Sequence, residues 1–185
     1  MIPFRRRDDP YMVPVRMTGV KMGDRVAFVG CAHGGRLAAI AAKVGLSGRA
    51  VAVVPDEASA VRVRKGAADA GVLVEVEVTS PQAMPADPAA FDLAVIDDTG
   101  GLLATMPDGD RAATAREVFR VLRPGGRVIV IGGSPRSGLG GLFNRAPAAP
   151  ALDPTPVLEA DGFKMVRSLG ERDGLKFIEG IKPRS

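Results

Sequence analysis

Residues 30–35, GCAHGG, carry the clearest chemical signal in the sequence. They follow the apolar run 26–29 and precede a helical stretch at 36–44. A buried parallel strand that leads through glycines into a helix is a common nucleotide pocket of α/β proteins, because the glycines let a ligand approach the backbone at the helix N-terminus. The only histidine, His33, and the only cysteine, Cys31, lie in this segment. We interpret the histidine as a loop side chain or a ligand contact, and the cysteine as buried packing.

Two neighbouring acids, Asp97 and Asp98, follow the apolar run 91–96 directly. Open α/β sheets bind their ligands at the carboxyl ends of the strands, so we expect both acids close to such a site. Asp97 is the candidate catalytic residue, as a substrate contact or a general base; the alternative is a strand-end acid that caps the next turn. The sequence holds no Ser-His-Asp grouping, no cluster of metal ligands and no phosphate-binding lysine loop. It therefore predicts no metal site.

Length and composition predict a single domain over residues 1–185, with residues 1–22 as an N-terminal cover. No apolar run approaches the ~20 residues that span a bilayer, and the first ten residues, MIPFRRRDDP, are too charged for a secretory signal, so a cytoplasmic protein is expected. A net charge of +4 with 4% aromatic residues is a weak nucleic-acid signal. We interpret the three arginines at 5–7 as part of a solvated N-terminus rather than as an anion-binding or partner-binding arm.

Strand patterns and helix patterns alternate, which predicts a largely parallel sheet covered by helices. The segment 72–78 alternates valine and glutamate and fits an edge strand with one wet face. The last two strands are joined by a link too short for a parallel crossover, so they are antiparallel and the sheet is mixed. Residues 132–156, rich in glycine, proline and serine, predict a long flexible loop. The expected strands are 25–29, 50–54, 72–78, 91–96, 127–131, 163–169 and 175–181, and the expected helices are 36–44, 56–70, 110–122 and 156–160.

Four segments, 23–35, 91–97, 116–133 and 159–183, together resemble the class I S-adenosylmethionine-dependent methyltransferases. The resemblance covers about residues 20–183 and is strongest in REVFRVLRPGGRVIVIGG, at 116–133, and in the tail that follows. It is closest to the small-molecule branch related to ubiquinone and menaquinone biosynthesis methyltransferases. The resemblance implies a Rossmann-like α/β fold with seven strands in the order 3-2-1-4-5-7-6, strand 7 antiparallel, and helices on both faces. It also implies S-adenosylmethionine as cofactor.

The chain departs from the family at the positions that hold the cofactor. The family's first motif is an acid, an apolar residue and Gly-x-Gly-x-Gly; here these places hold Phe28, Val29, Gly30, Cys31, Ala32, His33 and Gly34. The family's further acids, after the second and third strands, correspond to Val54 and Ser80. Asp56 is either a substitute for the second acid or the N-cap of the next helix. The resemblance thus implies a cofactor crevice lined by Gly30, Ala32, Gly34, Asp56 and Ser80.

Three functions remain open at this point. The first is a divergent methyltransferase that acts on a small molecule and binds its cofactor weakly, because each lost charge-assisted hydrogen bond is worth ~1.5–3 kcal/mol. The second is a non-catalytic, methyltransferase-shaped binding module. The third is a dinucleotide-binding protein that uses the spacing Gly30-x-Ala32-x-x-Gly35 but lacks an acid after the second strand. We expect a small-molecule substrate, no nucleic-acid or membrane partner, and self-association that covers apolar surface near the crevice.

Overall fold

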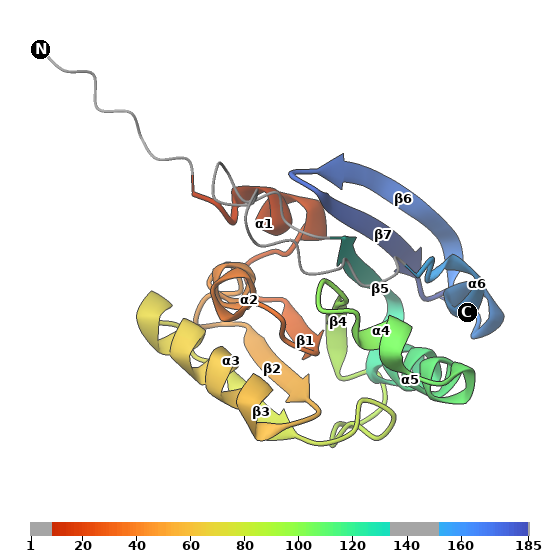
Figure 1. Ribbon diagram of the computed structural model, residues 1–185, viewed down its shortest axis with the longest axis horizontal. Helices are drawn as coiled ribbons and strands as arrows, with labels where there is room; N and C mark the ends of the chain where they lie inside the picture. Colours follow the sequence, from red (N-terminus) through yellow and green to blue (C-terminus); the bar gives the residue numbers. More distant parts are fainter. Residues whose placement is uncertain (1–8, 134–151, 185) are drawn as a thin grey trace, which may run out of the picture.

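The computed structural model describes residues 9–133 and 152–184, which form one seven-stranded sheet with helices on both faces (Figure 1). The strand order is β3-β2-β1-β4-β5-β7-β6, and β7 runs antiparallel to both of its neighbours. The predicted Rossmann-like fold and strand order are therefore confirmed. The strands are β1 (Arg25–Val29), β2 (Arg49–Val54), β3 (Glu75–Val78), β4 (Phe91–Asp97), β5 (Leu122–Gly133), β6 (Lys164–Arg172) and β7 (Leu175–Ile181).

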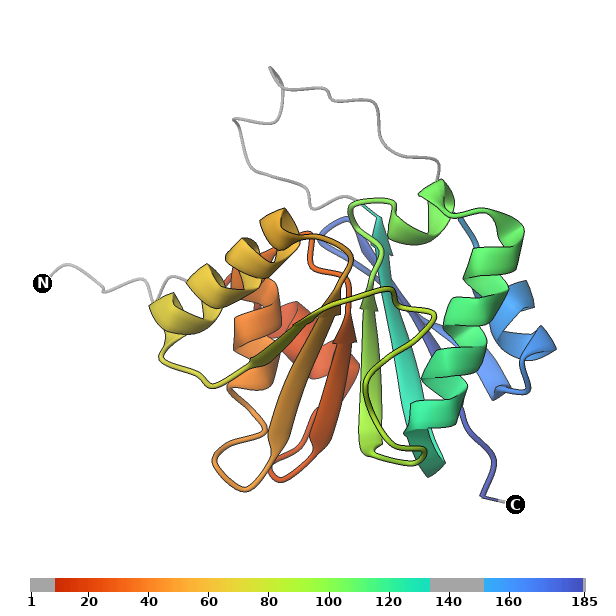
Figure 2. The same cartoon turned by 90° about the horizontal axis from the view of Figure 1, so that it is seen from below.

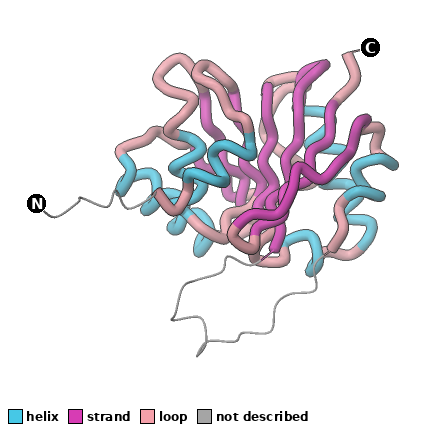
Figure 3. The backbone as a smooth tube through the Cα atoms, turned by 90° about the horizontal axis from the view of Figure 1, so that it is seen from above, coloured by secondary structure: helices cyan, strands magenta, loops and turns pink. Residues whose placement is uncertain are grey.

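The helices form two layers, one on each side of the strands (Figure 2). Alternate residues of the central strands face opposite layers, so that Phe28 packs with the first three helices and Val29 packs with the last three. Figure 3 shows the strands between the two groups of helices. Among the described residues, no helix is long and apolar enough to cross a membrane. The helices are α1 (Met12–Thr18), α2 (Gly34–Ala41), α3 (Glu57–Ala70), α4 (Leu102–Thr105), α5 (Asp108–Val121) and α6 (Thr155–Ala160).

Local signals explain where the elements near the site begin and end. Helix α3 begins after Asp56, whose carboxylate accepts the N–H of Ser59 at 2.7 Å. Strand β3 is an edge strand, with Val76 packed against the core and the glutamates on the other face, as the alternating pattern predicts. Strand β5 begins at Leu122, five residues before the prediction, because Leu122 pairs with Phe91 ahead of a register shift. The turn residues Pro124 and Gly125 had indicated a later start.

The bounds of α2, α5, β3 and β6 differ from the prediction by two to three residues at one or both ends, and an unexpected helix and the predicted loop differ more. Helix α4 was not expected, and it forms where the carboxylate of Asp98 accepts the N–H of Leu103 at 2.7 Å. Asp98 lies five residues before Leu103 in the sequence, and a helix of four residues is too short to show a repeat of apolar residues. Of the predicted loop 132–156, residues 134–151 lie outside the described residues, and Thr155 begins helix α6 one residue before the predicted start.

Helices α2 and α3 touch backbone to backbone at a pair of glycines. A Cβ atom on Gly34 would lie 2.1 Å from the carbonyl oxygen of Arg62, and one on Gly66 would lie 2.4 Å from the carbonyl carbon of Gly34. Both distances are below any van der Waals contact, so neither position accommodates a larger residue without movement of a helix. Gly34, which the resemblance assigns to the cofactor crevice, therefore also has a packing role.

The substitution Gly66→Ala is expected to lower the free energy of unfolding by about 1–3 kcal/mol, because the new methyl group overpacks the contact with Gly34. Urea unfolding measures the change. The matched control is Gly109→Ala in helix α5, where an added Cβ meets no atom within 4 Å and alanine favours the helix by about 1 kcal/mol at most. Equal effects of the two substitutions would show that the α2–α3 contact does not constrain position 66.

Candidate functional site

The turn after β1 and the turn after β4 meet at the carboxyl edge of the sheet. β1 and β4 are neighbours in the sheet, so their ends bring Ala32 and Asp97 together although they are 65 residues apart. The Oδ2 atom of Asp97 accepts the N–H of Ala32 at 2.9 Å. The structure thus joins the glycine-rich turn to the candidate catalytic acid.

Arg36, which sequence analysis did not single out, holds this acid from the first turn of α2. Its Nη2 donates to Oδ1 and Oδ2 of Asp97 at 2.8 and 3.1 Å, and to Oγ1 of Thr99 at 2.5 Å. Arg36 is 4% exposed and Asp97 is 8% exposed. One signal could have revealed the arginine: it precedes Ile40 by four residues and so lies on the apolar face of α2.

The chain's own side chains fill the space between the two turns. A Cβ atom on Gly30 would lie 2.7 Å from Cδ2 of Leu102, the first residue of α4, and one on Gly100 would lie 3.3 Å from the Cβ of Ala32. Phe28 is 2% exposed and packs in the core below the turns. The cavity that Phe28, Arg36 and Asp97 line together has a volume of about 10 Å³, which is room for about one water molecule.

Cys31 and His33 are the two other unusual residues of the turn, and the cysteine is not activated. Burial, followed by the charge of Asp97, raises the pKa of the Cys31 thiol to about 11, so that it is not a thiolate at neutral pH. The ring of His33 lies 5.4 Å from that of Tyr11, between the centroids, at the start of α2. The buried thiol agrees with the interpretation of Cys31 as packing, whereas His33 lines an open hollow of about 610 Å³ together with Tyr11 and Arg62, so both interpretations of the histidine stay open.

The two other predicted cofactor residues lie at the ends of neighbouring strands. Asp56 caps α3, and the hydrogen bond from the Ser59 backbone lowers the pKa of its carboxyl group. Ser80 is exposed and donates its hydroxyl to the side chain of Gln82. Within residues 9–133 and 152–184, no hydrogen bond joins Asp56 or Ser80 directly to the Arg36–Asp97 pair. Val54, at the position of the family's second acid, is completely buried.

Asp98 contributes its carboxylate to the base of α4, where it accepts the N–H of Leu103. Burial raises the pKa of its carboxyl group above the ordinary value of about 3.8; the hydrogen bond from Leu103 opposes this shift and the charge of Asp97 adds to it. The folded protein therefore binds this proton more tightly than the unfolded chain. The resulting contribution to stability is fully present below about pH 3.8 and is lost as the pH rises through the raised pKa.

The substitution Asp98→Asn is expected to change how stability depends on pH. An amide oxygen still accepts the N–H of Leu103, but it no longer loses a proton, so the variant should gain stability relative to the wild type as the pH rises through the pKa of Asp98. Urea unfolding of both proteins between about pH 4 and 7 measures the difference. A difference that stays constant over this range would contradict the raised pKa.

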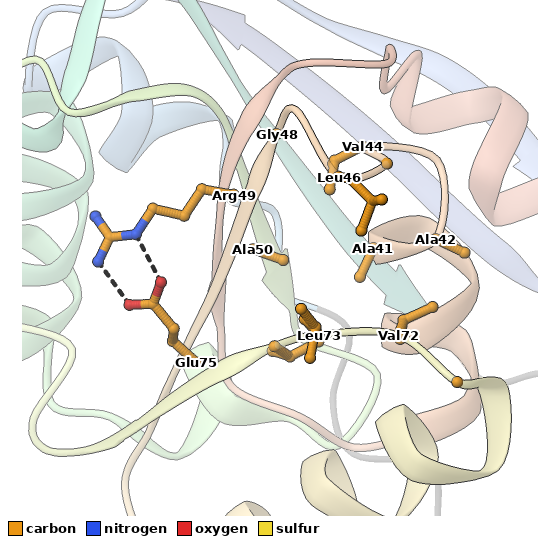
Figure 4. Close-up of a pocket in the computed structure, with 13 residues that line it drawn as sticks. Ala41, Ala42, Val44, Leu46, Gly48, Arg49, Ala50, Val72, Leu73 and Glu75 are labelled. Atoms are coloured by element: carbon orange, nitrogen blue, oxygen red, sulfur yellow. Dashed lines mark hydrogen bonds and ion pairs between the residues drawn. The ribbon is translucent and has the colours of Figure 1, made fainter.

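A larger hollow, of about 500 Å³, lies at the opposite edge of the sheet (Figure 4). Its walls come from the end of α2, the segment after α3 and the amino ends of β2 and β3, with Leu46 and Leu73 being 97% and 85% exposed. Arg49 and Glu75 form a two-point ion pair at its margin, with distances of 2.9 and 2.6 Å. It contains none of the predicted site residues, and ligands of open α/β sheets bind at the other edge. The crevice at the carboxyl edge is therefore the candidate site.

The strand order and the antiparallel β7 are those of a Rossmann-like methyltransferase fold. Residues 26–126, more than half of the chain, match the family described as methyltransferase domain. The chain belongs to this methyltransferase domain family, and the predicted class is confirmed. No curated protein matches the chain.

Solved structures share the fold at low sequence identity. An S-adenosylmethionine-dependent methyltransferase from Aquifex aeolicus has a TM-score of 0.72 and 19% identity, over 94% of this chain and 89% of its own. The [4+2]-cyclase SpnF has a TM-score of 0.70 and 17% identity, over 95% and 80%. An S-adenosylmethionine-dependent O-methyltransferase from Thermotoga maritima has a TM-score of 0.65 and 16% identity, over 94% and 64%. The fold is thus combined with more than one named activity.

The family implies S-adenosylmethionine as the methyl donor, and the resemblance places acids that would hold it at positions 28, 54 and 80. Position 28 holds a buried phenylalanine, position 54 a buried valine and position 80 an exposed serine, so none of the three places offers a carboxylate. The Ala32 N–H is already bonded to Asp97, and the cavity beside it is about 10 Å³. The described residues thus lack the three carboxylates that would hold the donor.

Proposed function

We propose that this protein is a divergent S-adenosylmethionine-dependent methyltransferase-like protein that acts on a small molecule and binds its donor weakly. The family match and the fold support the methyltransferase class. The observation that carries the weak binding is the loss of a carboxylate at Phe28, Val54 and Ser80. We further propose the branch related to ubiquinone and menaquinone biosynthesis methyltransferases, and a cytoplasmic protein without nucleic-acid or membrane partners.

The lost carboxylates matter more than the lack of a free general base. Methyl transfer from a sulfonium requires mainly that the acceptor be aligned with the methyl group and that water be excluded. Both carboxylate oxygens of Asp97, the candidate base, accept from Arg36, and the residue is 8% exposed, so the carboxylate is not free to contact an acceptor in this conformation. Donor binding, in contrast, depends on hydrogen bonds to charged groups, each worth roughly tenfold or more in affinity. Weak binding is therefore the expected phenotype.

Calorimetric titration with S-adenosylmethionine tests the proposal. Binding with a dissociation constant from roughly micromolar to millimolar, which is about 8 to 4 kcal/mol, supports a divergent methyltransferase. No heat up to millimolar concentration contradicts it and supports a non-catalytic module. Heat on addition of NAD, and not of S-adenosylmethionine, supports dinucleotide binding instead.

The non-catalytic module is the second candidate, and a specific observation favours it. Leu102, Arg36 and Phe28 fill the space that a ligand would need between the two turns. A protein that uses this fold only as a binding surface has no need of an open crevice. The dinucleotide reading is weaker, because its acid after the second strand is also replaced by the buried Val54.

The substitution Ser80→Asp is expected to raise the affinity for S-adenosylmethionine by roughly tenfold, because it restores a carboxylate at an exposed position without disturbing the core. Calorimetry measures the change. The matched control is Ser47→Asp, an exposed serine at the amino edge of the sheet that receives the same charge. An equal effect at both positions would show that position 80 does not face the donor.

A further inference from the structure

The glycine-rich turn is fixed from two sides by side chains of distant elements. From α3, Nε of Arg62 donates to the carbonyl oxygen of Cys31 at 3.1 Å. From the end of β4, Asp97 accepts the N–H of Ala32 at 2.9 Å. The two ends of one peptide group, the Cys31 carbonyl and the Ala32 N–H, thus bond to opposite charges, which leaves this peptide group little freedom to rotate.

The carboxylate of Asp97 is itself held in a single orientation. The hydroxyl of Thr99 donates to Oδ1 at 2.7 Å, and the Thr99 N–H donates to the same atom at 3.3 Å. Arg36 spans both oxygens and also reaches Thr99. A buried carboxylate requires such compensation, because an unpaired charge in the interior is costly. Arg36 and Thr99 therefore act on the turn through Asp97.

The apolar residue at position 28 favours the Arg36–Asp97 pair. In the first motif of the methyltransferase family, an acid occupies this position, whereas here Phe28 packs with Leu37 and Ile40 of α2. Phe28 lines the same small cavity as Arg36 and Asp97. A carboxylate at position 28 would compete with Asp97 for the one arginine, whereas the phenyl ring leaves the pair undisturbed in an apolar surrounding.

We propose that Asp97 and Arg36 are positioning residues for the glycine-rich turn, and that the acid which organises this turn lies at the end of β4, while position 28 of β1 holds an apolar residue. Asp97 then anchors the Ala32 N–H and does not serve as a general base. The effect on donor binding rests on the proposed function, but the effect on the turn does not. Each can therefore be measured separately.

The first experiment measures hydrogen exchange of the Ala32 amide by NMR, in the protein without ligand. In Asp97→Asn the exchange is expected to be roughly tenfold faster than in the wild type, because a charged acceptor is replaced by a neutral one. The matched control is Asp98→Asn, an acid of equal burial on the next residue that bonds Leu103 instead. Unchanged exchange in Asp97→Asn, or an equal change in both variants, would overturn the proposal.

The second experiment tests with a double-mutant cycle, read out as thermal unfolding, whether acids at positions 28 and 97 compete for Arg36. Phe28→Asp alone is expected to be destabilising, because two acids then compete for Arg36. In the double variant Phe28→Asp, Asp97→Asn, one acid again faces one arginine, so the loss should be smaller than the sum of the single losses. The control cycle, Phe28→Asp with Asp98→Asn, should be additive. Additivity in both cycles would show that positions 28 and 97 do not exchange roles.

The third experiment separates this inference from the proposed function. If S-adenosylmethionine binds the wild type, Asp97→Asn should bind it at least roughly tenfold more weakly, while Asp98→Asn should bind it unchanged. If the wild type does not bind it at all, the proposed function fails, and faster Ala32 exchange in Asp97→Asn still supports the anchoring role. If the wild type binds S-adenosylmethionine but the Ala32 amide exchanges equally fast in the wild type and in Asp97→Asn, the proposed function stands and the anchoring role is wrong.

Discussion

Phe28→Ala should lower the free energy of unfolding by about 3–5 kcal/mol, the cost of truncating a buried phenylalanine. The side chain is 2% exposed and packs with residues of α2, β2 and β4, so its removal leaves a hollow that these rigid elements do not close. Water that enters the hollow would also weaken the neighbouring Arg36–Asp97 pair. Urea unfolding measures the loss.

A graded control distinguishes packing from a specific role of the ring at position 28. Phe28→Leu keeps most of the apolar volume and is expected to cost less than about 1.5 kcal/mol. If Phe28→Ala costs no more than Phe28→Leu, the ring does not close the floor of the crevice. Titration of Phe28→Ala with S-adenosylmethionine, at a temperature where it is folded, then shows whether the filled volume alone weakens binding.

Glu179→Ala is expected to lower the free energy of unfolding by about 2–3 kcal/mol. Glu179 is buried in β7 and accepts from Arg127 at 3.2 Å and from Arg167 at 3.0 and 2.9 Å. Breaking a fully buried pair costs about 3–5 kcal/mol, but both arginines are partly exposed, so solvent reduces the cost. Urea unfolding measures the change.

Helix α1 provides a second readout for the Glu179 substitution. Arg127 also donates to the carbonyl oxygens of Thr18 and Gly19 at 3.2 and 3.1 Å, so it fastens the end of α1 to the sheet. Loss of Glu179 should therefore speed hydrogen exchange in α1 more than in α5. The control is Glu159→Ala, an exposed acid on α6, which should change neither quantity. Equal effects of the two substitutions would show that Glu179 does not anchor the helix.

The sequence was sufficient for most of the fold because its signals are local. The buried run at β1, the alternation at β3 and the short link before β7 each identify a strand and its surroundings without reference to distant residues. The strand order, in contrast, came from the family resemblance. Helix α4 escaped prediction because the contact that starts it, from Asp98 to Leu103, leaves no periodic pattern.

The candidate site could be predicted only as a location. The acids after β4 and the glycines after β1 were both expected at a ligand site, but nothing in either segment indicates that they bond to each other. The role of Arg36 is visible only in the tertiary structure, where β1 and β4 lie side by side and Oδ1 of Asp97 comes within 2.8 Å of Nη2 of Arg36. For Asp56, sequence analysis left a cofactor role and an N-cap open, and the structure shows the cap. Pairings across more than sixty residues need tertiary structure.

The glycine contact between α2 and α3 limits which elements can move when the crevice widens. Two helices whose backbones touch at Gly34 and Gly66 cannot slide or tilt separately without a collision, so they behave as one rigid body. On the other flank of the crevice, the atom nearest to a Cβ atom placed on Gly30 is Cδ2 of Leu102, the end of a flexible side chain. We therefore expect a widening that admits a guest molecule to displace the segment between β4 and α4 rather than the α2–α3 pair.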